Sequence, residues 1–463
     1  MKYNDKFMPI IIDVPFHDSM FPWVVQGVPD LLVPSFLCFC YNNRNIAFRA
    51  GWKKSHKALK VCPKRNRKKG MGIIMDRLTL EQLLPDMVKW RRHLHRHPEL
   101  SYQEKETSAF VAAKLIEFGI EVVRSKAGYG LTGILKGKSP GKTVVLRADM
   151  DALAITEENG REYASQNHGV MHACGHDGHT SMLLAAAAYY SSRREELQGE
   201  LRFLFQPAEE ICPGGALGMI AEGVLEGADA VYGLHLWTPL PVGKVASAPG
   251  PLMASADEFF IDITGKGGHA GTPHRTVDSI VAAAALVTQL QSIVSRSVDP
   301  MRPAVVSVGT IQGGTAQNIV AERCRITGTV RAFDEETRYL IRQRIEEMTA
   351  AVAASYGAEA KIDYLMGYPP LVNDEAEFQR YFRVAPAALG REVSVERMEK
   401  IMPAEDFSYY VKEIPGCFIF VGAGNPDKEA VYPHHHSKFD FDEDALLHGA
   451  KVLVAMADSC MNE

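Results

Sequence analysis

Strand-like and helix-like segments alternate along this 463-residue chain from about residue 79, and this alternation is the feature that most constrains its fold. In a first block we expect helices at 79–95, 107–118, 179–190 and 215–225 and strands at 143–148, 200–205 and 230–236. A second block adds a helix at 375–389, a strand at 417–421 and a helix at 443–460. Because parallel strands need crossover helices that cover both faces of a sheet, this order predicts an α/β domain with a mixed, mostly parallel sheet.

The segment between the two blocks follows a different order. Strands are expected at 258–264, 304–311, 325–333 and 358–364, and helices at 278–294 and 335–356. That order, βαββαβ, is typical of a smaller, ferredoxin-like α+β domain. We therefore expect one α/β domain, built from residues 75–255 and 369–463, that is interrupted by an inserted domain at 256–368.

Residues 1–74 differ from the rest of the chain in charge and in pattern. They hold 13 Lys and Arg against 4 Asp and Glu, a charge of +9, whereas the other 389 residues carry −14. The basic run at 52–69 is typical of a nucleic-acid-binding or targeting arm; the other interpretation is a non-native or disordered extension before a working protein that starts at Met75. The acidic remainder argues against nucleic acid as the main partner.

Composition predicts neither a membrane span nor a disulfide framework. The most apolar early stretch, 20–41, contains Gln26, Asp30 and three prolines, which a spanning helix would not tolerate. The first 15 residues lack the arrangement of a secretory signal, and the eight cysteines have no regular spacing. We therefore expect a cytoplasmic protein with reduced thiols.

Side chains that bind divalent metals gather where the expected strands end. Cys174 and His176 lie in a loop that opens a helix. Glu209 and Glu210 directly follow a strand, and His235 ends the next one. Strand ends share one sheet edge, and thiolate, imidazole and carboxylate groups suit borderline divalent metals, so the pattern indicates a metal site. Taken one at a time, these residues are equally typical of a reactive-cysteine loop, surface glutamates and a core histidine.

Three further histidine clusters need an interpretation. His269 lies in a glycine-rich turn of the inserted domain, and a triple histidine at 434–436 lies between the last strand and the last helix. Each is either an ordinary loop or part of the site. His93 and His95 are spaced like the ligands of barrel hydrolases, but those ligands end a strand and these two lie on an amphipathic helix.

In this order, the segments resemble the amidohydrolases of metallopeptidase family 20, the group of hippurate hydrolases, auxin-conjugate hydrolases and N-acyl-amino-acid deacylases. The resemblance runs from about Leu80 to the C-terminus, and residues 1–74 have no counterpart in it. Its motifs are Arg91-Arg-His-Leu-His-Arg-His-Pro-Glu-Leu100, Arg147-Ala-Asp-Met-Asp-Ala-Leu153, Met171-His-Ala-Cys-Gly-His-Asp-Gly-His179, Pro207-Ala-Glu-Glu210, Gly233-Leu-His235, Gly267-Gly-His-Ala270, Ala404-Glu-Asp-Phe407 and the His435 segment.

The resemblance implies a site for two divalent metal ions. The implied ligands are Cys174, His176, Glu210, His235 and His435. His435 is chosen over its neighbours because the family's ligand lies four residues before an aromatic residue, here Phe439. Two departures from the family, Ala154 and Ser437 in place of the usual prolines, remove no ligand and concern local loop shape.

The resemblance also assigns residues that act on the substrate. Glu209 matches the general base, and Asp149 matches the acid that orients groups beside the metals. His269 matches a lid histidine that reaches the partner subunit's site in related enzymes. Arg331, whose planar fork suits a carboxylate, and Asn318 are expected to bind substrate; a surface arginine is the alternative for Arg331.

The implied activity is hydrolysis of the amide bond of N-acyl amino acids, N-acetyl or N-benzoyl for example, by water held at the metals and activated by Glu209. Mn²⁺ is the favoured metal, and the mixed donors also admit Zn²⁺, Co²⁺ or Ni²⁺. The expected partners are a small-molecule substrate and a second copy of the chain, bound through the inserted domain, without nucleic acid or membrane. The alternatives are dipeptidase- or aminopeptidase-like activity at the same site and a non-catalytic metal-dependent binding protein.

Overall fold

A computed structural model describes residues 77–463, so the expectations for residues 1–74 lie outside the described residues. The helices are α1 (Leu80–Arg96), α2 (Lys105–Glu117), α3 (His176–Ser191), α4 (Ala216–Ala221), α5 (Ser279–Ser292), α6 (Glu335–Ser355), α7 (Glu375–Leu389), α8 (Ser408–Glu413) and α9 (Ala445–Met461). The strands are β1 (Glu121–Arg124), β2 (Leu131–Lys136), β3 (Ser139–Asp149), β4 (Gln198–Gln206), β5 (Ala230–Pro241), β6 (Lys244–Ser247), β7 (Gly250–Met253), β8 (Asp257–Thr264), β9 (Gly268–His269), β10 (Ala304–Gly313), β11 (Ile319–Val320), β12 (Arg323–Ala332), β13 (Glu359–Leu365), β14 (Leu371–Asn373), β15 (Ser394–Arg397) and β16 (Gly416–Gly424). Every helix and strand expected from the sequence has an observed counterpart among them.

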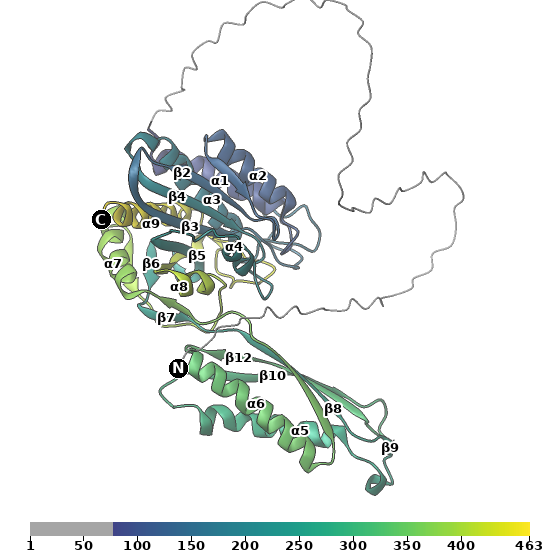
Figure 1. The fold of residues 1–463 in the computed structure, drawn as a ribbon. Coiled ribbons are helices and arrows are strands. Elements are labelled where there is room, and N and C mark those ends of the chain that lie inside the picture. Colours follow the sequence, from purple (N-terminus) through teal and green to yellow (C-terminus); the bar gives the residue numbers. More distant parts are fainter. Residues whose placement is uncertain (1–76) are drawn as a thin grey trace, which may run out of the picture. The chain divides into compact units, whose positions relative to one another are not determined.

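The larger sheet has eight strands in the order β1-β2-β4-β3-β5-β16-β6-β15 (Figure 1). Four of its seven neighbouring pairs are parallel: β4 with β3, β3 with β5, β5 with β16, and β6 with β15. The three consecutive parallel pairs form the centre, and the antiparallel pairs lie toward the edges. This arrangement confirms the predicted mixed, mostly parallel sheet, and it brings the carboxyl ends of the central strands to one edge.

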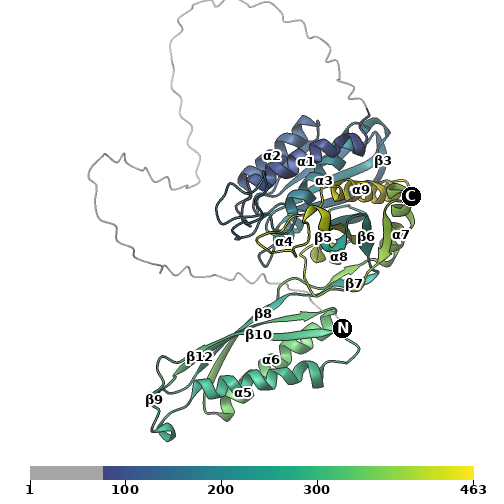
Figure 2. The ribbon, with the colours of Figure 1, turned by 180° about the vertical axis from the view of Figure 1, so that it is seen from behind.

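Both faces of this sheet are covered. In β3, Val144 and Leu146 belong to the core cluster that holds residues of α3 and α9, whereas Val145 belongs to the cluster that holds residues of α4 and α8. Alternate side chains of a strand point to opposite faces, so a strand buried on both faces is apolar throughout. Figure 2 shows α1, α2, α3 and α9 lying together on one side of these strands.

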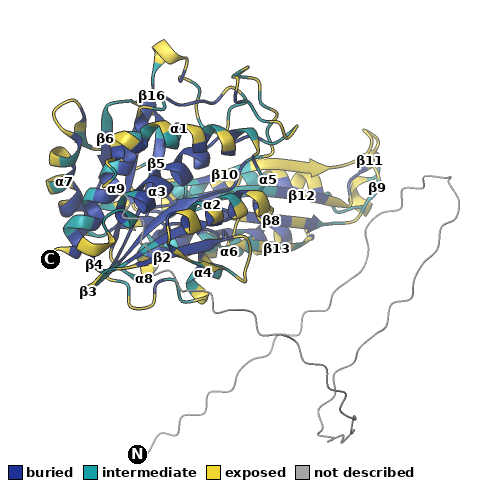
Figure 3. Ribbon diagram, turned by 90° about the horizontal axis from the view of Figure 1, so that it is seen from above, coloured by how far each residue is buried: buried dark blue, intermediate teal, exposed yellow. Residues whose placement is uncertain are grey.

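Helix α3 is buried along nearly its whole length, and Figure 3 colours it mostly dark blue. Four consecutive alanines, residues 185–188, let its neighbours come close. At Gly449 of α9, an added Cβ would lie 2.2 Å from the sulfur of Met182 in α3, so the Met182 side chain would have to move. Close neighbours on several sides hold α3 in place, and with it the loop and the histidine at its N-terminus.

The inserted segment forms its own four-stranded antiparallel sheet, in the order β10-β12-β8-β13. The chain passes through β8, α5, β10, β12, α6 and β13, which confirms the predicted ferredoxin-like βαββαβ order. Helices α5 and α6 lie along this sheet, and their apolar side chains form a core cluster separate from those of the larger sheet (Figure 1). A short ribbon of β9 and β11 extends from this domain.

Helix α5 has apolar residues on more than its core-facing side. The segment Ser279–Ser297, which continues α5 through a π-helical turn, is long and apolar enough to cross a membrane by length and composition alone. Ala282, Leu286 and Leu290 are buried against the inserted sheet, as in the core helix of a globular domain. Within residues 77–463, Ile280 and Val281 on another face stay exposed, which leaves an apolar surface there.

Helix α1 carries a buried arginine at the centre of an ionic network. The helix starts with a capping box between Thr79 and Gln82. Arg91 is fully buried and donates to Asp177 (2.9 Å), Asp440 (2.7 Å) and Glu443 (3.2 Å). Burial alone would raise the pKa of the Asp440 carboxyl, but the Arg91 guanidinium and a hydrogen bond from Tyr163 outweigh it and place that pKa below its usual range.

Replacing Asp440 with asparagine is expected to reduce the pH dependence of stability. A carboxyl whose folded pKa lies below the unfolded value of about 3.9 stabilises the fold above that pH and loses the contribution as pH falls toward the folded pKa. Urea unfolding of wild type and Asp440→Asn between pH 3 and pH 7 should therefore show a difference in unfolding free energy that narrows at the acidic end. A difference independent of pH would contradict this assignment.

Candidate metal centre

The loop after β4 carries two neighbouring glutamates, and an aspartate accepts hydrogen bonds from the backbone of both. Asp151, which follows β3, accepts the backbone N–H groups of Glu209 and Glu210, both at 3.0 Å. Ala208 just before them has a φ of 56°, a left-handed conformation that few non-glycine residues adopt. The backbone conformation of Ala208 and the hydrogen bonds to Asp151 together fix the shape of this turn. This shape in turn sets the direction of both glutamate side chains.

The side chains expected to bind metal converge at this sheet edge. One ligand atom each from Cys174, His176 and His235 lie within 4.8 Å of one another, and the same holds for Cys174, Glu210 and His435. The Cys174 sulfur is 3.4 Å from Nε2 of His235, and a Glu210 carboxylate oxygen is 3.3 Å from Nε2 of His435. The two groups share Cys174, which gives two overlapping clusters of donor atoms.

Hydrogen bonds at the far ring nitrogens prepare two histidines as ligands. Nδ1 of His176 lies 2.9 Å from the backbone carbonyl oxygen of Asp151, and Nδ1 of His235 lies 2.6 Å from that of Leu236. A carbonyl oxygen only accepts, so Nδ1 carries the proton in each ring. In the neutral imidazole, Nε2 then has a free lone pair, which is the arrangement that metal-binding histidines use.

The donor set fits a divalent cation on electrostatic grounds. Nε2 of His176 is buried and has no hydrogen-bond partner among the described residues, yet carboxylate oxygens of Asp149, Glu209 and Glu210 lie 3.8–3.9 Å from it. Burial raises the pKa of the Cys174 thiol well above its usual value, and the carboxylates around it raise that pKa further. A bound cation would neutralise this excess of negative charge and stabilise the thiolate.

Glu209 lies next to the expected ligands, and one of its carboxylate oxygens is within 4.8 Å of donor atoms of His176 and Glu210. Its backbone carbonyl accepts a 2.6 Å hydrogen bond from the Tyr368 hydroxyl, and its carboxylate approaches those of Glu405 and Asp406 within 4.8 Å. Burial raises the pKa of the Glu209 carboxyl well above its usual range, and the Glu405 and Glu210 carboxylates raise it further. Such an environment suits a group that both accepts and donates a proton.

A cavity of about 550 Å³ opens onto these residues. Arg331 lines it from the inserted domain, and its guanidinium donates to the Thr329 hydroxyl and to the Val330 carbonyl (3.0 Å). His269 and Asn318, in contrast, do not line this cavity. They are exposed neighbours on the ribbon of β9 and β11, where the Asn318 carbonyl accepts the N–H group of Ala270 (3.0 Å).

Two residues with positioning roles were not recognised in the sequence. His179 accepts the Leu236 N–H at Nε2 (2.9 Å), and its Nδ1 lies 2.7 Å from Asp149, so it fixes that carboxylate. Arg147 is buried and donates to Asp149 (2.8 Å), Gln206 (2.9 Å) and Asp406 (2.8 Å). A charged residue within the otherwise apolar strand at 143–148 was the available signal for Arg147, because a buried arginine needs acidic partners.

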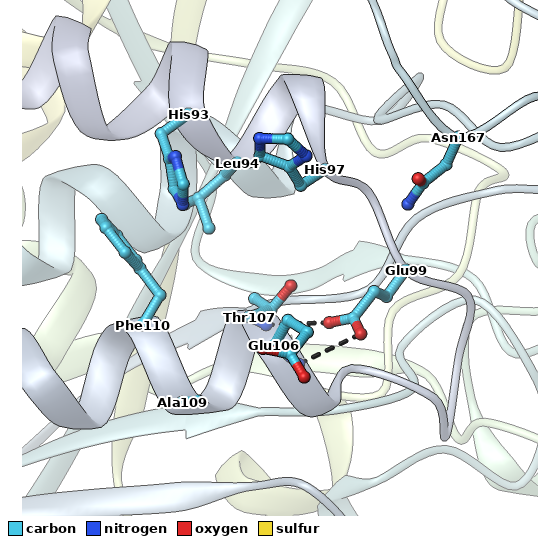
Figure 4. Close-up of a pocket in the computed structure, with 9 residues that line it drawn as sticks. All are labelled: His93, Leu94, His97, Glu99, Glu106, Thr107, Ala109, Phe110 and Asn167. Atoms are coloured by element: carbon cyan, nitrogen blue, oxygen red, sulfur yellow. Dashed lines mark hydrogen bonds between the residues drawn. The ribbon is translucent and has the colours of Figure 1, made fainter.

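The His93-Leu94-His95 segment does not form the alternative metal site. On a helix, residues two apart point to nearly opposite sides. His95 is buried, with one ring nitrogen 2.8 Å from Asp177 and the other 3.0 Å from Glu157. His93 instead faces a separate pocket of about 470 Å³ between α1 and α2, where Figure 4 shows it near Phe110.

Comparison with known proteins identifies the family of this chain. The sequence profile of peptidase family M20/M25/M40 matches residues 145–459, more than half of the chain. An N-acyl-L-amino acid amidohydrolase of Geobacillus stearothermophilus is 48% identical over 299 residues, 64% of this chain and 81% of that protein. Thermostable carboxypeptidase 1 of Saccharolobus solfataricus is 38% identical over 383 residues, 81% of this chain and 96% of that protein.

Among solved structures, the YXEP protein of Bacillus subtilis, a dinuclear metal-binding peptidase from the M20 family, has a TM-score of 0.71 and 34% identity and covers 82% of this chain and 99% of that one. Fold, arrangement of donor atoms and sequence thus lead to the same conclusion. The chain belongs to peptidase family M20/M25/M40.

Proposed function

We propose that this member of the family, an amidohydrolase, cleaves the amide bond of N-acyl amino acids to a carboxylic acid and a free amino acid. The observation that supports this most is the convergence of two overlapping donor clusters, a protonatable Glu209 and the cation Arg331 on one cavity. The relative in Geobacillus stearothermophilus bears the name of this activity.

In this proposal two divalent ions are held by the five converging residues: Cys174, His176, Glu210, His235 and His435. Bound there, they would polarise the amide carbonyl and lower the pKa of water toward about 7. The YXEP protein, whose fold is similar, is a dinuclear metal-binding peptidase, which supports two ions here. Mn²⁺ is our first choice, and the mixed sulfur, nitrogen and oxygen donors also admit Zn²⁺, Co²⁺ or Ni²⁺.

Glu209 handles the proton in this scheme. Its carboxylate lies within 4.8 Å of donor atoms of His176 and Glu210, and it takes the proton of the attacking water. The same carboxyl then delivers that proton to the departing amine nitrogen, for which its raised pKa is suited. Asp149 acts as the orienting acid. Arg147 and His179 hold its carboxylate in place, and one of its oxygens lies 3.8 Å from Nε2 of His176.

Substrate recognition is assigned to the inserted domain. Arg331 binds the carboxylate of the amino acid, because its forked guanidinium matches two carboxylate oxygens. His269 and Asn318 lie on the exposed ribbon and outside their own chain's cavity, which supports a role in the site of a second subunit. The exposed apolar side chains of α5 support pairing of two chains through this domain.

Peptide hydrolysis is the second candidate, because thermostable carboxypeptidase 1 matches almost along its whole length. A carboxypeptidase also cleaves an amide bond next to a free carboxylate, so Glu209 and Arg331 would keep their roles. Only the group on the acyl side would differ. A panel that includes N-blocked dipeptides beside simple N-acyl amino acids separates the two candidates.

The test is amine release by chelator-stripped protein before and after Mn²⁺ or Zn²⁺ is restored. We expect stripped protein to be inactive and metal to restore hydrolysis of N-acetyl, N-benzoyl or indole-acetyl amino acids, because the bound ions would polarise the carbonyl and lower the pKa of water. The measurement is ninhydrin-type detection of free amine, with bound metal quantified in the same samples. If metal-loaded protein releases no amine from any substrate of the panel, the proposed function is overturned in favour of a binding role.

A further inference from the structure

The end of α1 carries a pair of exposed histidines that the catalytic scheme does not use. His93 lies in the last turn of the helix, and His97 is its C-cap residue. Both line the pocket of about 470 Å³ between α1 and α2 (Figure 4). Neither is a member of the donor clusters at the edge of the larger sheet. The pocket therefore needs an explanation of its own.

The spacing of the two histidines is one that binds metal ions. Side chains four residues apart lie on the same face of a helix, and two histidines at this spacing are a known arrangement for holding one transition-metal ion. The ring centroids of His93 and His97 are 5.0 Å apart, with an interplanar angle of 61°. His95 points elsewhere, and its ring nitrogens face Asp177 and Glu157. The pair is thus His93 with His97.

The separation of the two rings fits an ion shared between them. A metal ion lies about 2.1 Å from the imidazole nitrogen that binds it, and hence about 3.2 Å from the centroid of that ring. Two rings that bind one ion at a tetrahedral angle therefore have centroids about 5 Å apart, as His93 and His97 do. Because both side chains are exposed, rotation of the rings can direct one nitrogen of each toward the ion while the helix stays in place.

The nitrogens of both imidazoles are free within the pocket. Among the nine residues that Figure 4 draws, the only hydrogen bonds run to the carboxylate of Glu99. Partial burial lowers the pKa of the His93 imidazole below its usual value, and neighbouring positive charges, that of His97 first, lower it further. A neutral imidazole has the lone pair that a metal ion requires.

Two carboxylates line the same pocket and bring negative charge to it. Glu99 accepts the backbone N–H groups of Glu106 (3.0 Å) and Thr107 (2.8 Å) at the start of α2, so its carboxylate is already held in place. The Glu106 side chain is exposed at the pocket. Negative charge near the two imidazoles favours a cation there, and water from the open side can complete its coordination.

We propose that His93 and His97 together bind one divalent transition-metal ion, Cu²⁺, Ni²⁺ or Zn²⁺, at a site separate from the catalytic centre. Imidazole nitrogens suit these ions, whereas Mn²⁺ and Mg²⁺ prefer oxygen donors, and Cu²⁺ binds most tightly of the series. The ion joins the last turn of α1 to its C-cap residue and so stabilises that end of the helix. The proposal is independent of the proposed function, because neither histidine takes part in hydrolysis.

The experiment measures how strongly metal-loaded full-length protein is retained on a column that carries chelated Cu²⁺ and is eluted with an imidazole gradient. The variants are His93→Asn, His97→Asn and the double variant. His274→Asn is the matched control, because His274 is an exposed histidine of the inserted domain. All variants share the remaining histidines, so the differences between them report on the pair. Thermal unfolding without added metal checks that each variant is folded.

A second measurement counts the ions bound in solution. Chelator-stripped wild type and variants are dialysed against Ni²⁺ at the lowest free concentration that saturates wild type, and nickel per chain is determined by atomic absorption. We expect each single variant to bind one Ni²⁺ ion fewer than wild type and than His274→Asn. The affinity of this site should fall at least about 10-fold, since even the loss of a residue that merely supports a ligand costs that much.

On the column, both single variants should elute at a clearly lower imidazole concentration than wild type and His274→Asn. The double variant should elute with the single variants, because one shared ion needs both rings and is lost with either. Additive effects of the two substitutions, or shifts no larger than that of His274→Asn, would show that the histidines act singly and overturn the proposal. Equal nickel content in wild type and the variants overturns it as well. Hydrolytic activity bears on neither readout, so failure of this proposal and failure of the proposed function are distinguishable.

Discussion

Glu209→Gln is expected to lower kcat by about 1000-fold while the protein keeps its bound metal, because glutamine has nearly the same shape and cannot accept the proton of water. The carboxylate lies beside the donor clusters, and the neighbouring Glu210 is the member that converges with Cys174 and His435. Steady-state hydrolysis of an N-acyl amino acid and metal content, measured on the same preparation, check both parts of the expectation.

The matched control is Glu117→Gln, which removes an exposed carboxylate on α2. It should leave kcat and metal content unchanged. Two results would contradict the role of Glu209: turnover within about 10-fold of wild type, less than the usual contribution of a general base, or loss of metal on substitution, which would make the residue a ligand.

Arg147→Met is expected to destabilise the fold by about 3–5 kcal/mol, the range measured when one partner of a buried ionic network is removed. The Arg147 side chain is buried between Asp149 on β3 and the Glu405–Asp406 pair, whose nearest oxygens lie 2.8–3.0 Å from its nitrogens. Methionine fills the space of the stem and leaves those carboxylates without a counter-charge. Urea unfolding with metal removed measures the change without a contribution from binding.

Arg325→Met provides the comparison, because its ion pair with Asp262 is about half exposed on both sides. A pair of that kind contributes at most about 1 kcal/mol. Equal destabilisation by the two variants would show that Arg147 is not the counter-charge of the acidic cluster. Double substitution of Arg147 and Asp406 should recover part of the loss, since it removes one of the unpaired charges.

The parts of the fold that the sequence predicts are those with a strong local pattern. The central strands β3, β4, β5 and β16 are apolar runs bounded by turns, and they were found. The edge strand β1 was not, because three of its four residues are exposed and carry no alternation of apolar and polar side chains. The ribbon strand β9 has only two residues in a glycine-rich turn, which no periodicity can reveal.

The residues of the candidate site likewise fall into those that a local sequence pattern locates and those that it does not. Glu209 and Glu210 were located because they follow the end of β4, which is visible locally. His235 was expected to end its strand and instead lies within β5, which continues to Pro241. The contact of Arg147 with Asp406 joins positions 259 residues apart, and nothing in either neighbourhood specifies the other. Among the three consecutive histidines, only the family's spacing to an aromatic residue, here Phe439, singled out His435. The structure separates them, because His435 has a φ of 65° and faces Glu210 while His434 stacks on Trp237.

The place of β16 between β5 and β6 has a consequence for the way the chain is made. A ribosome releases residues in order, so the edge of β5 has no neighbour on that side until residues 416–424 have emerged. The inserted domain, complete by residue 365, contains its own core and can fold during this interval. His435 emerges later still. The nascent chain therefore cannot complete the donor cluster that includes His435 until synthesis is almost finished.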